Sequence, residues 1–197
     1  MSQSDPVVIV GMARTPMGGL LGELSSFSAN ELGAFAVKAA VEEAKLGADE
    51  ADEIIMGNCL PAGQGQAPAR QSGFKAGMDK GLEATTINKM CGSGMQAAVM
   101  GRNAILAGEA NVVIAGGMDS MTNAPHLMNV RKGHKYGNMG AEDHMALDGL
   151  TDAYAGGPMG NFADMIATEY QFTREQQDAY ALETCLLYTS PSPRDRG

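Results

Sequence analysis

The sequence predicts an α/β fold in which a mostly parallel sheet lies between layers of helices. Short apolar runs rich in β-branched residues alternate with segments whose apolar residues recur at helical intervals, and this alternation is typical of such a sheet. The 197 residues are 44% hydrophobic and only 19% charged, which excludes wholesale disorder. The 26 glycines fit tight turns and close packing of helices on a sheet.

The N-terminal part is predicted to contain one strand and one helix. Residues 7–10 form a continuous β-branched run that Gly11 ends, as in a strand buried on both faces. Ser28 and Glu31 have the spacing of a capping box, and apolar residues then recur at helical intervals up to Gly47. We therefore expect the first strand to be followed by an amphipathic helix.

Three further strands and two further helices follow. Residues 53–57 predict the second strand, and a helix is expected at 68–76 after a loop rich in Gly and Gln. Residues 85–88 predict the third strand. Residues 92–107 carry an apolar helical face, and residues 112–115 predict the fourth strand.

The sequence divides into an α/β domain at residues 1–122 and part of a loop domain at residues 123–184. The segment up to residue 160 is rich in Gly, Met, Asn and His and shows no clear periodicity. A second capping-box pattern at Thr173 opens a helix that reaches at least Thr184.

The last thirteen residues, CLLYTSPSPRDRG, differ abruptly in composition from the rest of the chain. These residues are not expected to continue the preceding helix, because Pro191 and Pro193 forbid it, and the run resembles the translation of a sequencing-library adapter read in frame. We expect residues 185–197 to be a non-native tail and the natural sequence to be cut off at about Thr184. A genuine flexible tail is the alternative.

Charge and composition restrict the partners of the chain. A net charge of −9 repels polyanions, so nucleic acid binding is not expected. No apolar run is long enough to cross a bilayer, and the polar start lacks the character of a signal or transit peptide, so we expect no membrane partner and a cytoplasmic location. The cysteines form no CxxC pattern and the histidines are irregularly spaced, so neither a disulfide framework nor a metal site is expected. These residues are Cys59, Cys91, Cys185, His126, His134 and His144.

Cys91 is the candidate nucleophile. In the stretch KMCGSGMQA it follows a predicted strand and begins a predicted helix, where unpaired backbone N–H groups and the positive helix end favour a thiolate anion. Gly92 and Gly94 let substrate and backbone approach closely. The N–H groups that follow would hold the oxyanion formed when an acyl carbonyl is attacked. Cys59, just after a strand, is expected to be a core thiol.

Two other interpretations of the same stretch remain open. Cys91 can be a small buried residue in a Gly-rich turn. Gly92 and Gly94 also match the GxGxxA dinucleotide fingerprint, which needs an acidic ribose ligand about 20 residues further on. The candidates are Glu109, which precedes the next strand, and Asp119, which lies well past its end, and the fingerprint belongs after the first strand rather than the third.

Several ordered motifs identify a family that the chain resembles. They occur at residues 14–18 (RTPMG), 56–71 (MGNCLPAGQGQAPARQ), 88–97 (NKMCGSGMQA), 115–128 (AGGMDSMTNAPHLM), 148–150 (DGL), 158–160 (PMG) and 173–181 (TREQQDAYA). Together they make nearly the whole chain from Val7 to Thr184 similar to the thiolase family, in particular to acetyl-CoA acetyltransferases and 3-ketoacyl-CoA thiolases.

The resemblance implies a thiolase-like layered fold and a reversible Claisen condensation. Cys91 would be acylated, and the acyl group would pass to coenzyme A or to the carbanion of a second acetyl-CoA, which gives acetoacetyl-CoA. Acetyl-CoA and 3-ketoacyl-CoA are the implied substrates. Coenzyme A is a substrate here, and no cofactor is expected. A decarboxylating ketoacyl synthase shares this chemistry but differs in its motif around the cysteine.

The resemblance also assigns binding and interface residues. Met159 would line the pocket beside the acyl group, although a packing role is an equal alternative. A basic cluster would attract the anionic coenzyme, or would be a solvated loop; it comprises Arg131, Lys132, His134 and Lys135. A homodimer or homotetramer is implied, with an interface near Gln66, Arg70 and Asn88 whose alternative is packing within one chain. Pro158 stands where the family often has His.

Parts of the family pattern do not occur in these 197 residues. Thiolases are about twice as long, and their second half carries a Gly-His-Pro histidine, an Asn-Glu-Ala-Phe asparagine and a Cys-x-Gly-Gly cysteine, for which Cys185 stands in the wrong context. A nucleophile without these partners reacts slowly, so the chain alone is expected to be inactive. The family's first domain needs one more strand, so residues 112–115 are expected to leave an open sheet edge. A non-catalytic acyl-CoA-binding module is the non-enzyme alternative.

Overall fold

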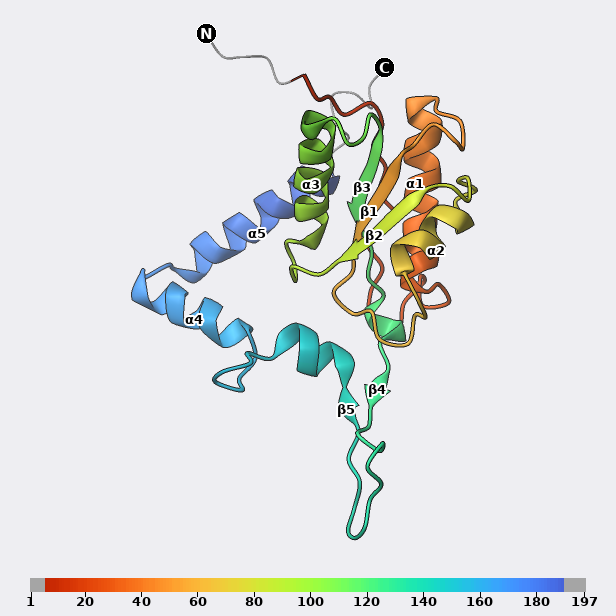
Figure 1. Cartoon of the computed structure of the whole chain (residues 1–197). Coiled ribbons are helices and arrows are strands. Elements are labelled where there is room, and N and C mark those ends of the chain that lie inside the picture. The colour runs from red at the N-terminus through yellow and green to blue at the C-terminus, as the bar shows by residue number, and fades with distance from the viewer. Residues whose placement is uncertain (1–5, 190–197) are drawn as a thin grey trace. The chain divides into compact units, whose positions relative to one another are not determined.

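The computed structural model describes residues 6–189 of the chain (Figure 1). The chain forms two compact units that divide after Gly149. The first unit holds the sheet, its helices and a β-ribbon, and the second holds two helices. Residues 190–197, which make up most of the predicted non-native tail, lie outside the described residues.

The sheet of the first unit has three parallel strands in the order β2-β1-β3. They are β1 (Glu53–Gly57), β2 (Glu83–Ile87) and β3 (Val113–Gly117). The predictions of strands at 53–57, 85–88 and 112–115 are therefore confirmed, with small shifts at the ends. Ile54 and Ile55 of the central strand are almost completely buried, because helices cover both faces of β1.

Helices α1 (Ala29–Ala44) and α2 (Pro68–Lys75) lie on one face of the sheet, and α3 (Ser93–Ala107) lies on the other (Figure 1). All three are at the positions that the sequence predicts. Because successive side chains of a strand point to opposite faces, Ile54 and Met56 join the apolar core beneath α1 and α2, whereas Ile55 faces away from it.

The predicted capping box at the start of α1 is confirmed. The backbone N–H of Ser28 donates to Glu31 Oε2 at 2.9 Å, and the Ser28 hydroxyl donates to the same oxygen at 2.6 Å. These hydrogen bonds hold the pKa of Glu31 below its ordinary value. Lys75 Nζ lies 3.5 Å from Glu31 Oε1 and links the end of α2 to the start of α1.

The prediction of a strand at residues 7–10 is wrong. This segment forms no strand in the described part of the chain, and Val8, Ile9 and Val10 are 71%, 75% and 60% exposed. The β-branched run indicates burial on two faces, but a strand also needs a neighbouring backbone to bond. Neither edge strand supplies one, since within residues 6–189 β2 and β3 each pair only with β1.

Residues 123–160 are more regular than their sequence predicts. Strands β4 (His126–Leu127) and β5 (Glu142–Asp143) form an antiparallel ribbon, whose connecting loop projects away from the sheet in Figure 1. A short 3₁₀ turn, η1 (Met121–Asn123), precedes the ribbon, and a π-helix, η2 (Met145–Leu150), follows it. Strands of two residues are too short to give a periodic signal, which is why the sequence suggests only a loop.

The second unit contains α4 (Gly160–Glu169) and α5 (Arg174–Thr189). The sequence misses α4, because no capping side chain marks its start. The start of α5 is predicted correctly: Thr173 N donates to Gln176 Oε1 at 2.9 Å, and Gln176 N donates to Thr173 Oγ1 at 3.3 Å. The expectation that the helix stops before residue 185 is wrong, since Pro191 excludes helix only close to itself.

No helix between residues 6 and 189 is both long and apolar enough to cross a bilayer.

The first turn of α3 packs directly on the backbone of the sheet. A Cβ atom added at Gly57, the last residue of β1, would lie 2.5 Å from the Cβ of Ser93. A Cβ at Gly117, the last residue of β3, would lie 3.4 Å from the Cα of Gly94. The helix approaches the end of β1 so closely that only glycine fits at Gly57, whereas a Cβ at Gly117 would make an ordinary contact.

Replacing Gly57 by alanine is expected to destabilise the first unit by about 1–3 kcal/mol, because α3 must move away from the sheet. The urea midpoint followed by far-UV circular dichroism measures this loss. Gly19→Ala is the matched control, since a Cβ at Gly19 meets nothing within 4 Å. Equal midpoints for the two variants would show that the close approach does not limit stability.

Candidate active site

Cys91 lies between β2 and α3, at the carboxyl end of the parallel sheet, where open α/β sheets bind ligands. A cavity of about 320 Å³ opens beside it. Segments that follow all three strands contribute to its wall. The lining residues are Gly57, Cys59, Met90, Cys91, Ser93, Gly94, Gly117, Met118, Asp119 and Met121.

The turn before Cys91 holds Met90 in the left-handed region, with φ at 49°. This conformation costs a side-chain-bearing residue about 1–2 kcal/mol, and hydrogen bonds on both sides of the residue offset it. The N–H of Met90 donates to Asn88 Oδ1 at 2.9 Å, and its carbonyl accepts from Ser93 Oγ at 2.6 Å. Ser93 Oγ in turn accepts from Lys89 N at 2.8 Å. The turn leaves Cys91 exposed at its tip.

The N-terminus of α3 offers backbone donors next to Cys91. Gly92 caps the helix without a side-chain hydrogen bond, and the first turn contains no acidic residue. Within residues 6–189, the N–H groups of Gly94 and Met95 donate to no protein acceptor, as is normal for the first turn of a helix. An anion on Cys91, or on an oxygen attached to it, would therefore meet free donors and the positive end of the helix dipole.

Asp119, after β3, holds the segment that follows β1. Its Oδ1 accepts hydrogen bonds from Cys59 N at 2.9 Å, Leu60 N at 3.0 Å and Asn58 Nδ2 at 2.9 Å. Asn58 is fully buried and also donates to the carbonyl of Met118 at 3.0 Å. This carboxylate fixes the loop that carries Cys59 against the end of the neighbouring strand.

The dinucleotide interpretation of Gly92 and Gly94 finds little support in this arrangement. The carboxylate of Asp119, one of the two candidate ribose ligands, is already bonded to three donors of the β1 loop. The strands before and after α3 are also separated by β1, whereas the dinucleotide fold places the two strands that flank its fingerprint side by side.

Cys59 is half-buried and lines the cavity of Cys91 instead of lying in the core. Burial is the main cause that raises the pKa of its thiol, and the nearby carboxylate of Asp119 adds to the effect. Its Sγ donates to the carbonyl of Met90 at 2.9 Å. The sequence did not reveal this neighbour of Cys91, because it does not show which strands are adjacent.

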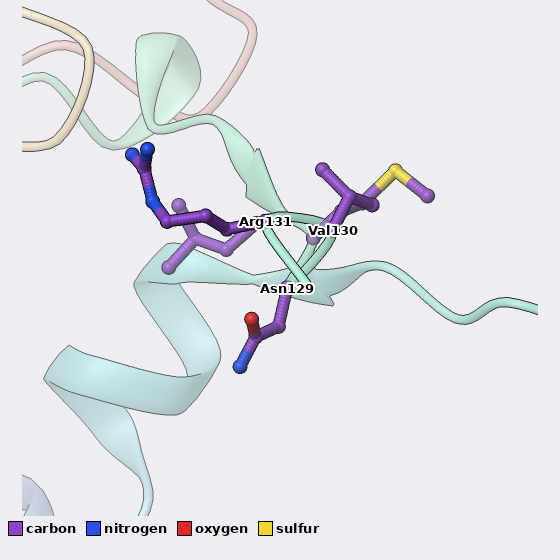
Figure 2. Close-up of a pocket in the computed structure, with 5 residues that line it drawn as sticks. Asn129, Val130 and Arg131 are labelled. Carbon is purple, nitrogen blue, oxygen red and sulfur yellow. The ribbon is translucent and has the colours of Figure 1, made fainter. Parts of the chain in front are cut away.

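The basic cluster lies in the exposed loop between β4 and β5. Arg131 lines a hollow of about 520 Å³ together with residues 127–130. Figure 2 shows its side chain pointing to a different side of the loop from that of Asn129. His134 Nε2 lies 2.7 Å from the carbonyl oxygen of Gly137, and Lys132 and Lys135 are exposed. No residue of the cluster lines the Cys91 cavity as described.

The predicted interface residues make contacts within their own chain. The carbonyl of Gln66 accepts from Gln71 Nε2 at 2.8 Å. Arg70 donates to the carbonyls of Lys80 and Leu82, and its guanidinium lies 4.5 Å from the centre of the Phe74 ring. Asn88 supports the Met90 turn and follows β2, an edge strand of the described sheet. An interface at these residues stays a prediction.

Met159 belongs to the second unit, where it precedes α4 and donates its N–H to the carbonyl of Leu150 at 2.9 Å. Its predicted place beside the acyl group stays a prediction. His144, in the first unit, is 4% exposed, and its Nδ1 lies 2.6 Å from Asp148 Oδ2. Its Nε2 accepts from Ala62 N at 3.4 Å, so this imidazole joins η2 to the β1 loop.

Residues 7–185 match the family described as "Thiolase, N-terminal domain". The chain belongs to the thiolase family. A cytosolic acetyl-CoA acetyltransferase of Gibberella zeae is 44% identical over 93% of this chain and 47% of its own length. A probable acetyl-CoA acetyltransferase of Mycobacterium tuberculosis is 50% identical over 88% of this chain and 44% of its own length.

A solved thiolase has the same fold. The crystal structure of Acat5 thiolase from Ascaris suum in complex with coenzyme A has a TM-score of 0.84 and 39% identity, and the match covers 89% of this chain and 46% of that one. The chain thus spans about half the length of the thiolases it matches. Curated relatives include both cytosolic and mitochondrial proteins.

Truncating Asp119 to alanine is expected to release the β1 loop, because Cys59 N, Leu60 N and Asn58 Nδ2 lose their shared acceptor. A loss of about 3 kcal/mol of local stability is expected from such unpaired donors. Hydrogen exchange of peptides that cover residues 58–60 measures it. Asp49→Ala, in an exposed turn, is the matched control, and equal protection in the two variants would contradict the role of Asp119.

The two thiols of the cavity are expected to differ in alkylation. Because its pKa is raised, Cys59 remains protonated at about pH 7 and reacts with N-ethylmaleimide more slowly than exposed Cys91. Its rate continues to rise at pH values above the ordinary pKa of cysteine. Peptide mapping after timed labelling measures both rates. Labelling in urea is the control, since the difference should vanish on unfolding, and a difference that persisted there would not come from burial.

Proposed function

We propose that Cys91 is the acyl-accepting nucleophile of a thiolase-type acyltransferase, which condenses two acetyl-CoA molecules to acetoacetyl-CoA or cleaves 3-ketoacyl-CoA in the reverse direction. The observation that supports this most is the exposed Cys91 at the tip of a strained turn and at the start of α3. The names of the curated relatives and the coenzyme A complex of the Ascaris thiolase support the same substrates.

In the first half-reaction, the sulfur of Cys91 attacks the carbonyl carbon of an acyl-CoA thioester. The carbonyl oxygen becomes negative and would be stabilised by the free N–H groups of Gly94 and Met95. Collapse of this intermediate expels the coenzyme A thiolate and leaves an acyl group on Cys91. In the second half-reaction, this group passes to the carbanion of acetyl-CoA, or to coenzyme A.

The 197-residue chain by itself is expected to stop after the first half-reaction. The sequence has no Gly-His-Pro, Asn-Glu-Ala-Phe or Cys-x-Gly-Gly motif, so no group of those types deprotonates Cys91 or acetyl-CoA. Without such a base, acylation is expected to be slow.

Binding of the coenzyme and assembly of subunits belong to the same proposal. Exposed positive charges at Arg131, Lys132 and Lys135 suit the phosphates of coenzyme A. Met159 would line the pocket beside the acyl group. An oligomer would use the open edge of β2, near Gln66, Arg70 and Asn88. The cytosolic Gibberella relative supports a cytoplasmic location.

Incubation with acetyl-CoA followed by intact mass spectrometry tests the proposal. One acetyl group per chain is expected, and it should be absent in Cys91→Ser. Cys185→Ser, which removes the other exposed thiol, should retain the adduct. Binding of acetyl-CoA without any adduct would instead support a non-catalytic acyl-CoA-binding module.

A further inference from the structure

Two thiols face one cavity, although they lie far apart in the sequence. Cys59 follows β1 and Cys91 follows β2, and these strands are adjacent and parallel, with Gly57 paired to Ile87 at their carboxyl ends. Both cysteines line the cavity of about 320 Å³. The acyl transfer described above uses Cys91 and gives no role to Cys59.

The hydrogen bond of Cys59 limits the distance between the two residues. Its Sγ lies 2.9 Å from the carbonyl oxygen of Met90, and that carbonyl belongs to the peptide bond that leads into Cys91. In a trans peptide, a carbonyl oxygen lies about 3 Å from the next Cα, so the Cys59 sulfur is within about 6 Å of the Cys91 Cα. A disulfide needs the two sulfur atoms about 2 Å apart and the Cα atoms about 4.4–6.8 Å apart, so both thiols must turn toward each other within the cavity to form one.

We propose that Cys59 is a resolving thiol, which converts Cys91 into a reversible disulfide after a hydroperoxide has oxidised Cys91. The site is the cavity shared by the two thiols, and the co-reactant is hydrogen peroxide or an organic hydroperoxide. The disulfide would protect Cys91 from irreversible oxidation and would block its acylation until a thiol reductant restored both residues.

The reaction has two balanced steps. The Cys91 thiolate attacks one peroxide oxygen; a sulfur–oxygen bond forms, the oxygen–oxygen bond breaks, and the peroxide is reduced to water or an alcohol. The Cys59 thiol first loses its proton, and the thiolate attacks the sulfur of the Cys91 sulfenic acid. A sulfur–sulfur bond forms, the sulfur–oxygen bond breaks, and the leaving hydroxide is protonated to water.

The surroundings of the two thiols set the order of these steps. Burial raises the pKa of Cys59, which therefore stays protonated and is a poor target for peroxide, whereas Cys91 is exposed. The second step needs the Cys59 thiolate, so disulfide formation should become faster as the pH rises. The inference does not depend on the proposed acyl transfer, since peroxide needs no acyl-CoA.

Peptide mapping of the oxidised chain tests the proposal. The 197-residue chain carrying Cys185→Ser is treated with hydrogen peroxide and alkylated. It is then run on a non-reducing gel, and the protein in the monomer band is digested with trypsin. Trypsin places Cys59 in the peptide 46–70 and Cys91 in the peptide 90–102. We expect these two peptides to be linked, the link to disappear on reduction, and its yield at a fixed time to increase with pH.

Trapping of the sulfenic acid supplies the matched control. Cys59→Ser in the same background should carry at least about fivefold more dimedone adduct on Cys91, because no thiol resolves it. Cys59→Ala replaces this variant if the serine variant does not fold, as judged by circular dichroism. If Cys91 proceeds to sulfinic acid and the linked peptides are absent in the Cys185→Ser chain, the proposal is wrong, whatever the Cys59 variants do.

Discussion

The contact between the first turn of α3 and the bare backbone of β1 and β3 determines where the groups of the site lie. A side chain at Gly57 would hold the helix away from the sheet. With the helix seated, Ser93 is buried and its hydroxyl reaches back to the turn before Cys91. The geometry of the nucleophile is thus a consequence of helix–sheet packing, and the strain at Met90 is sustained by contacts that the core itself holds in place.

The carbonyl of Met90 connects the chemistry of the site to its scaffold. It accepts from Ser93, which belongs to α3, and from Cys59, which belongs to the loop after β1. Asp119 fixes that loop from the end of β3. The segments that follow β1 and β2 therefore meet at one peptide group, and the segment that follows β3 holds the first of them in place, so a change in any of the three would alter the exposure and direction of Cys91. These hydrogen bonds fix the position of Cys91, although it lies on a loop, as firmly as a helix or a strand would.

Local signals in the sequence were sufficient for much of this fold and insufficient for contacts between distant segments. The strand at 53–57 and the start of α1 at Ser28 depend on a few neighbouring residues, and both are where the sequence predicts them. Residues 7–10 have the composition of a strand, but pairing depends on a partner that sequence periodicity does not specify. Cys91 could be found from its position after a strand, whereas Cys59 became its neighbour only once the order β2-β1-β3 was known.

The β-branched run at residues 7–10 has a thermodynamic consequence. Ordering a free chain into a strand costs about 1–2 kcal/mol of backbone entropy for each residue. The β-branched side chains of this run restrict its alternative conformations, so part of that loss precedes any pairing. Pairing of a complementary strand with Val8, Ile9 and Val10 would therefore cost less conformational entropy. More of the hydrophobic free energy gained by covering their side chains would then contribute to the binding free energy.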